Sequence, residues 1–146
     1  GRHEEAATAF QSALATGAAT HYASEAALQL GDLALEREAA QEAERFFREA
    51  STRAAGEGAV AVRARAFMGL GRAAVLAGSN EDASRYFLSV AILFDDAVMV
   101  PESLYMAAQS FDRLGRGDDR DKVVSELVER YPAGEWTRKA REAWPM

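Results

Sequence analysis

The sequence predicts an all-α fold in which pairs of antiparallel helices stack into a solenoid. Apolar residues recur at i, i+3, i+4 and i+7 through most of the chain, which is the spacing of one helix face. Only three prolines occur among the 146 residues, and two of them lie in the last fifteen, so long stretches contain no helix breaker. An internal repeat is the third observation, and it places the helices.

The repeat consists of a small residue, an aromatic residue four positions later and a small or apolar residue three further on. Its three copies are Ala6, Phe10 and Ala13, then Ala43, Phe47 and Ala50, then Ala83, Phe87 and Val90. A Leu-Gly pair lies 13 residues before the alanine in two of them, at Leu30-Gly31 and Leu70-Gly71. A weaker fourth copy has Ala107-Ala108 in the Leu-Gly positions and Val123 and Leu127 in the Ala and Phe positions, after a loop about three residues longer. One helix pair cannot bury its apolar face alone, so neighbouring pairs are expected to stack.

The predicted elements form one domain over residues 1–146. Residues 1–17 supply the second helix of a repeat whose first helix is expected upstream of Gly1, as in the C-terminal part of a longer array. The next segments are repeats at 18–56 and 57–95, a degenerate repeat at 97–132 and a C-terminal capping helix at 133–146. The first helix is therefore expected to leave one side exposed or to be covered by another molecule, including a second copy of the chain.

These positions resemble the tetratricopeptide repeat, whose pattern is W-x2-L-G-x2-Y, then A-x3-F, then P. The Trp position holds Ala27, Phe67 and Leu104, and the Tyr position holds Ala34, Ala74 and Phe111. The periods of about 37 and 40 residues exceed the family's 34, and the additional residues are expected in loops such as "RAAGEGAVA". The resemblance covers roughly residues 1–132 and implies a right-handed superhelical solenoid of about eight helices.

The stretch "ERYPAGEWTRKAREAW" also resembles the C-terminal part of bacterial envelope members of this family, those of the Tol–Pal accessory and outer-membrane assembly lipoprotein type. That resemblance implies a bacterial protein. The compartment, cytoplasmic or periplasmic, stays open.

Composition excludes several kinds of function. The chain has no cysteine, so disulfides, zinc–thiolate sites and thiol nucleophiles are excluded. A formal net charge of −6 argues against a nucleic-acid partner, since binding phosphates requires a cationic surface. No apolar run reaches the roughly 20 residues that a membrane helix needs, so no membrane insertion is expected in this segment.

Three motifs suggest chemistry but have simpler explanations. Gly69 to Ala74 reads G-x-G-x-x-A, yet no strand context surrounds it and the repeat already accounts for Leu70-Gly71. Arg116-Gly117-Asp118, with Asp119 and Asp121, is expected to be a turn between helices whose aspartates cap the next helix. His3 and His21 have no partners at catalytic spacing. The sequence therefore predicts no enzyme, no catalytic residue, no metal site and no cofactor.

The resemblance implies that the first helix of each pair lines a concave groove that binds a peptide or protein segment. The predicted groove residues are Glu25, Gln29, Asp32, Arg65, Met68, Arg72, Glu102, Tyr105, Met106, Gln109 and Arg113. Arg65 and Arg72 lie two turns apart on one helix, a spacing that suits a partner's carboxylate. The Lys, Arg and Asn clamp of chaperone-binding relatives is not matched, because the only asparagine, Asn80, falls in a loop.

The leading hypothesis is a non-catalytic scaffold or adaptor that binds a protein or peptide partner through a repeat groove. The alternative is a structural spacer or self-association module of a larger, envelope-associated bacterial protein.

Overall fold

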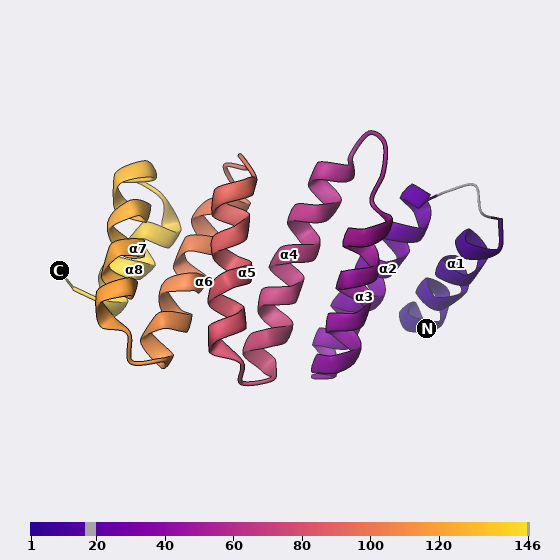
Figure 1. Ribbon diagram of the computed structural model, residues 1–146, viewed down its shortest axis with the longest axis horizontal. Coiled ribbons are helices and arrows are strands. Elements are labelled where there is room, and N and C mark those ends of the chain that lie inside the picture. The colour runs from indigo at the N-terminus through magenta and orange to yellow at the C-terminus, as the bar shows by residue number, and fades with distance from the viewer. Residues whose placement is uncertain (17–19, 146) are drawn as a thin grey trace. The chain divides into compact units, whose positions relative to one another are not determined.

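The computed structural model describes residues 1–16 and 20–145, and in these ranges the chain forms eight α-helices and no strand (Figure 1). The helices are α1 (Arg2–Thr16), α2 (Thr20–Glu36), α3 (Ala40–Arg53), α4 (Ala59–Leu76), α5 (Asn80–Leu93), α6 (Met99–Arg113), α7 (Gly117–Arg130) and α8 (Glu135–Ala143). The all-α prediction is confirmed. The side chain of Ala13 and the expected repeat boundary between residues 17 and 18 lie outside the described part.

The helices form two compact units, Gly1–Gly78 and Ser79–Met146. In the N-terminal unit α2 packs against α1, α3 and α4, and α3 also packs against α4. In the C-terminal unit α6 packs against α5, α7 and α8, and α7 also packs against α8. The central helices of the two units, α2 and α6, are therefore each the first helix of a predicted pair. No helix in the described ranges is both long enough and apolar enough to span a membrane.

The helix lengths and turn conformations repeat more regularly than the amino-acid sequence does. The second helices α3, α5 and α7 each contain 14 residues, and each follows a turn of three residues. The middle residue of each turn has a left-handed backbone, with φ of 58° at Glu38, 77° at Gly78 and 72° at Gly115. In two of the turns the preceding helix ends with a hydrogen bond between residues five apart in the sequence. Ala39 N donates to Ala34 O at 2.8 Å, and Arg116 N donates to Phe111 O at 2.9 Å. Such bonds are typical of a helix that ends in a Schellman motif.

This regularity corrects the predicted position of the last repeat. The turn before α7 is no longer than the other two, so the expected assignment of Val123 and Leu127 to the Ala and Phe positions is wrong. Counted from the start of each helix, the Ala position of α7 is Arg120 and the Phe position is Val124. Arg120 breaks the apolar pattern at the Ala position. The predicted positions therefore lie three residues too far along the helix.

The three residues that separate the 40-residue period from the 37-residue period lie in a helix. Residues 54–58 and 94–98 form connections of equal length. The difference between the 40-residue and 37-residue periods is a difference in helix length, 18 residues in α4 against 15 in α6.

The ring of Phe47 lies between two glycines in the N-terminal unit. Phe47 is 1% exposed. A Cβ atom added to Gly31 of α2 would lie 2.6 Å from the ring, and one added to Gly69 of α4 would lie 2.5 Å from it. Neither distance is tolerable for a carbon–carbon contact, so glycine at both positions allows α2 and α4 to approach the ring. Gly69 therefore has a packing role within a continuous helix, and the G-x-G-x-x-A stretch has no strand before it.

Replacing either glycine with alanine should destabilise the protein. We expect Gly31→Ala and Gly69→Ala each to lower the free energy of unfolding by about 1–3 kcal/mol, because the added methyl group overpacks the site. In a Phe47→Leu background the loss from Gly31→Ala should shrink, since the smaller side chain vacates the space. Urea denaturation measures the free energy of unfolding of each variant. Gly117→Ala, where the nearest side-chain atom is 3.7 Å away, is the matched control, and equal losses there and at Gly31 would contradict the packing role.

The turn at Glu38 should gain stability from glycine. A left-handed backbone costs a residue with a Cβ atom about 1–2 kcal/mol, and glycine occupies this position in the other two turns. Allowing for the greater freedom of glycine in the unfolded chain, we expect Glu38→Gly to raise the free energy of unfolding by about 0.5–1 kcal/mol. Glu38→Ala removes the carboxylate and keeps the strain, so it should show no such gain in the same urea titration.

Candidate functional site

The predicted groove residues of α2 lie on one face of that helix. Glu25, Gln29 and Asp32 follow one another at four and three residues, and Gln29 and Asp32 are exposed while Glu25 is half-buried. On α4, Arg65 is exposed and Arg72 is half-buried. Met68 does not reach this surface, because its side chain is 3% exposed. The reason is that α4 packs against both α2 and α3, so its buried face is wider than one repeat position indicates.

The charges on α2 and α4 oppose one another. Glu25 and Asp32 of α2 correspond to Arg65 and Arg72 of α4, each pair being 40 residues apart in the sequence. Arg65 Nη1 donates to Glu25 Oε2 at 3.2 Å. The carboxylate that the sequence analysis expects from a partner is therefore supplied at Arg65 by the neighbouring helix.

Asp32 is held in a partly dehydrated position. Loss of hydration raises the pKa of the Asp32 carboxyl above its ordinary value, the positive charges of Arg65 and Arg72 oppose that rise, and the negative charge of Glu36 adds to it. Dehydration is the largest of these effects. The protonated form of this carboxyl is therefore favoured slightly more than in an ordinary surface aspartate.

Asp32 and Gln29 form part of a hollow between α1 and α2. The hollow has a volume of about 530 Å³ and is lined by Arg2, Glu5, Ala6, Ala9, Gln29, Asp32 and Leu33. Its apolar floor is formed mostly by small side chains. Its charged groups are the carboxylates of Glu5 and Asp32 and the guanidinium of Arg2, which lies 3.9 Å from Glu36 of α2. We refer to it below as the α1–α2 hollow.

The α1 side of this hollow is not among the predicted groove residues, because all of these lie on the first helix of a pair. A signal was available: a shift of 37 residues, which superimposes Ala6 on Ala43, also superimposes Glu5 on Glu42.

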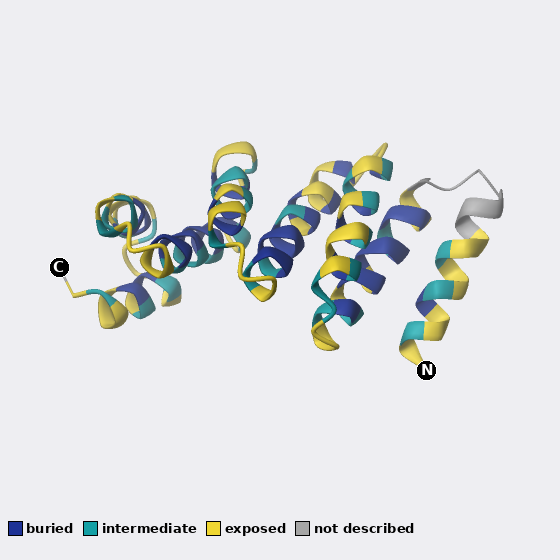
Figure 2. Ribbon diagram, turned by 60° about the horizontal axis from the view of Figure 1, so that its bottom comes forward, coloured by how far each residue is buried: buried dark blue, intermediate teal, exposed yellow. Residues whose placement is uncertain are grey.

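A second hollow of about 460 Å³ borders a different face of α1. It is lined by Ala7, Phe10, Gln11, Leu30, Arg45, Phe46 and Glu49. Phe10 and Phe46 meet edge to face at 6.4 Å between ring centroids, and the Arg45 guanidinium lies 4.9 Å from the Phe46 centroid. Among residues 1–12, whose side chains are described, only Ala6 is buried (Figure 2). Helix α1 thus has uncovered surface on two sides.

In the C-terminal unit the predicted groove residues lie against the end of the chain. The Tyr105 ring contacts those of Trp136 of α8 and Trp144, with centroids 5.2 and 5.6 Å away and ring planes tilted by 41° and 43°. Gln109 Nε2 donates to Tyr105 Oη at 3.2 Å. Met106 and Glu102 are half-buried, and Arg113 is exposed. The tyrosine therefore contacts the protein's own tryptophans where an external ligand was expected.

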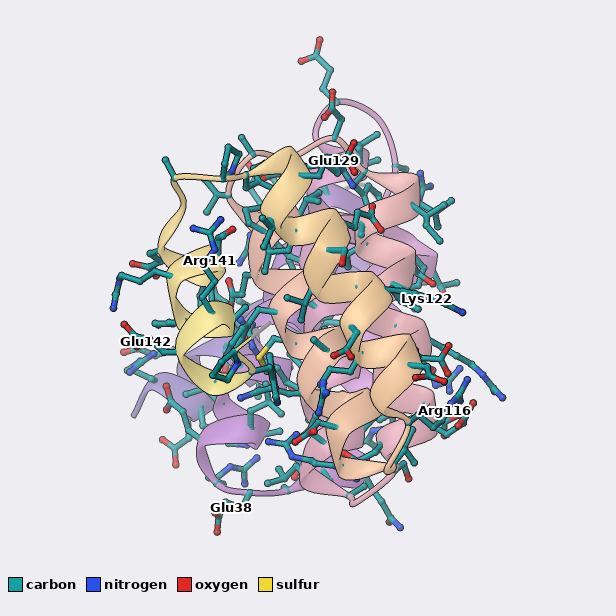
Figure 3. All side chains as sticks on the ribbon, turned by 90° about the vertical axis from the view of Figure 1, so that its left-hand side faces the viewer. Glu38, Arg116, Lys122, Glu129, Arg141 and Glu142 are labelled. Atoms are coloured by element: carbon teal, nitrogen blue, oxygen red, sulfur yellow. The ribbon has the colours of Figure 1, made fainter. Side chains whose placement is uncertain are left out.

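Helix α8 is anchored by more than these rings. The fully buried Thr137 hydroxyl donates to Tyr131 O at 2.6 Å; within α8 itself, Lys139 Nζ lies 4.1 Å from the Trp136 centroid. Side chains on the outer surfaces of α7 and α8, such as Lys122, Glu129 and Arg141, point into solvent (Figure 3). The described part of α8 covers α6 and α7 as a capping helix does.

The C-terminal unit also exposes three large apolar side chains near one connection. Ile92, Leu93 and Val98 are 77%, 63% and 76% exposed. Asp96 holds the connection by accepting hydrogen bonds from Val98 N at 2.9 Å and Met99 N at 2.8 Å. The three residues are a surface on which another molecule would bury apolar area.

The Arg116-Gly117-Asp118 stretch lies at the predicted turn between helices, but its aspartates do not cap α7. The start of α7 has no side-chain cap. Arg116 instead pairs with Asp119 at 2.8 Å and with Glu81 at 3.1 Å. Within residues 1–16 and 20–145, no group of three or more His, Asp or Glu side chains is arranged to hold a metal ion.

Comparisons with known proteins give no relative from which to infer a role: no protein-family model, no curated protein and no solved structure matches the chain.

The Glu25–Arg65 pair should behave as a matched pair of charges. Arg65→Glu places two carboxylates opposite each other, so the free energy of unfolding should fall by about 0.5–1 kcal/mol, the range of partly exposed pairs. The exchanged double variant Arg65→Glu/Glu25→Arg restores the pair and should recover most of that loss. Thermal unfolding of wild type, both single variants and the double variant completes the cycle. Strictly additive losses would contradict the pairing.

Proposed function

We propose that this chain is a non-catalytic scaffold of tetratricopeptide type, part of a right-handed superhelical solenoid, that binds a peptide or protein segment. Two features support the proposal: the sequence pattern of paired helices with Leu-Gly positions, and the repetition of the same three-residue turn before α3, α5 and α7. Antiparallel helix pairs that repeat in this way expose long helix faces, which are suited to gripping a segment of another chain.

The observation that carries the proposal is the α1–α2 hollow. Two predicted groove residues, Gln29 and Asp32, line it beside the small side chains of Ala6 and Ala9. An amide that donates and accepts, an exposed carboxylate and an apolar floor are the groups that fix the orientation of a bound segment and reward its burial. The other candidate residues contribute less to an open surface, because Arg65 is paired, Met68 is buried and Tyr105 is stacked.

Panning a library of displayed 15-residue peptides against the immobilised protein tests the proposal. We expect enriched peptides that bind with a Kd below about 1 mM in calorimetry. The double variant Gln29→Ala/Asp32→Ala should weaken them at least about tenfold, since it removes the two polar groups that α2 contributes to the hollow. The control variant Glu38→Ala/Glu57→Ala changes two exposed side chains away from it. A library without enriched peptides, or peptides that bind the first variant as tightly as wild type, would refute the proposal.

Self-association is the alternative that the exposed side chains of Ile92, Leu93 and Val98 favour. Sedimentation velocity in the same buffers distinguishes the two functions. A scaffold that binds peptides as a monomer keeps one sedimentation coefficient over a range of concentrations, whereas a self-association module gives a coefficient that rises with concentration.

A further inference from the structure

We propose that the hollow between α1 and α3 binds a small aromatic carboxylate, a flat ring with an anionic group on a short tether. This is the hollow of about 460 Å³ whose lining includes Phe10 and Phe46, and we call it the phenylalanine hollow. The inference goes beyond the proposed function, because it concerns a small molecule and a different site. The phenylalanine hollow and the α1–α2 hollow have no lining residue in common, so the two sites can be tested separately.

The Phe10 ring is uncovered because the two helix pairs of the N-terminal unit differ at one position. Phe10 of α1 corresponds to Phe47 of α3 at a shift of 37 residues. Phe47 is 1% exposed and lies where Gly69 of α4 has no Cβ atom. Helix α2 has Gln29 at the position of Gly69, 40 residues earlier, and its Cβ atom would meet a ring placed there. Phe10 is accordingly half-buried and meets Phe46 of α3.

The two phenylalanine rings form walls that suit a flat aromatic group. Their planes lie at 82° with centroids 6.4 Å apart, and the buried Leu30 of α2 adds apolar surface. Both rings are half-buried, so a third ring between them gains aromatic contacts and removes apolar surface from water. The volume of about 460 Å³ lies within the range of small-molecule sites, about 300–1,000 Å³.

Arg45 supplies the positive charge of the phenylalanine hollow. Its guanidinium lies 4.9 Å from the Phe46 centroid, and among the side chains of residues 1–12 and 21–145 no carboxylate lies within 4 Å of it. Glu49, the acidic residue of the lining, is paired with Arg53. A guanidinium recognises a carboxylate through two parallel hydrogen bonds. The charge and the aromatic walls together favour an anionic ring over a neutral or cationic one.

Titration of 3-phenylpropionate into the full chain tests the inference. Two related compounds are controls: 3-phenylpropionamide keeps the ring and lacks the charge, whereas propionate keeps the charge and lacks the ring. We expect a Kd for 3-phenylpropionate below about 1 mM in calorimetry, and binding of either control at least about tenfold weaker. Chemical-shift changes in nuclear magnetic resonance should be confined to the residues around the phenylalanine hollow.

Variants test the charge and the ring separately. Arg45→Gln should weaken binding of 3-phenylpropionate at least about tenfold and leave that of 3-phenylpropionamide unchanged, because it removes only the charge. Phe46→Leu should weaken binding of both compounds about threefold or more, since it removes an aromatic wall and keeps the position apolar. Arg48→Gln is the matched control, because Arg48 lies on the same helix, pairs with Glu44 and does not line the hollow. Circular dichroism checks that each variant keeps the helical content of wild type.

Three outcomes would overturn the inference: no binding of 3-phenylpropionate up to about 1 mM, equal binding of the uncharged amide, or equal losses in Arg45→Gln and Arg48→Gln. Asp32→Ala alters only the α1–α2 hollow and should bind 3-phenylpropionate as wild type does. A loss in that variant would assign the ligand to the α1–α2 hollow and would also overturn the inference. None of these results bears on the peptides selected for the scaffold function, which require Gln29 and Asp32.

Discussion

The packing of the N-terminal unit depends on one aromatic ring between two glycines. Phe47 projects from α3 and touches Gly31 of α2 on one side and Gly69 of α4 on the other. The ring fills the space that the two absent side chains leave, so three helices share a single contact. Because protein interiors are close-packed, the identity of all three residues is constrained at once. The positions of Glu25, Asp32 and Arg65 on the surface follow from this spacing of α2 and α4.

Electrostatics decides which parts of the surface remain available. Along α2 and α4 the charges of opposite sign face each other, and the Glu25–Arg65 pair satisfies both groups within the unit. An arginine that already has a carboxylate at 3.2 Å offers less to a ligand than its sequence position indicates. Asp32 lies among the positive charges of Arg65 and Arg72 of α4 and also lines the α1–α2 hollow. Its carboxylate therefore faces both the neighbouring helix and an open surface.

The helices at the two ends of the described chain differ in how far other side chains cover them. Trp136 and Trp144 cover Tyr105 at the C-terminal end, and Thr137 fixes α8 through a buried hydrogen bond. At Arg120, where α3 and α5 have a fully buried alanine, the guanidinium contacts Asp112 at 2.7 Å and lies 6.0 Å from the Trp144 centroid. Helix α1 has no comparable cover on its described side chains. Within the described residues, α8 is therefore better covered by neighbouring side chains than α1.

The sequence by itself determined the helical class and buried positions such as Ala43, Phe47, Ala83 and Phe87. Those properties follow from local periodicity, from small residues at fixed spacing and from the scarcity of proline, all of which can be read along one chain. The tertiary structure decided the positions of Arg120 and Val124 in the last repeat, the packing role of Gly69, the pairing of Arg65 and the stacking of Tyr105. Each of these depends on a side chain from another helix, at a distance that spacing along one helix does not specify.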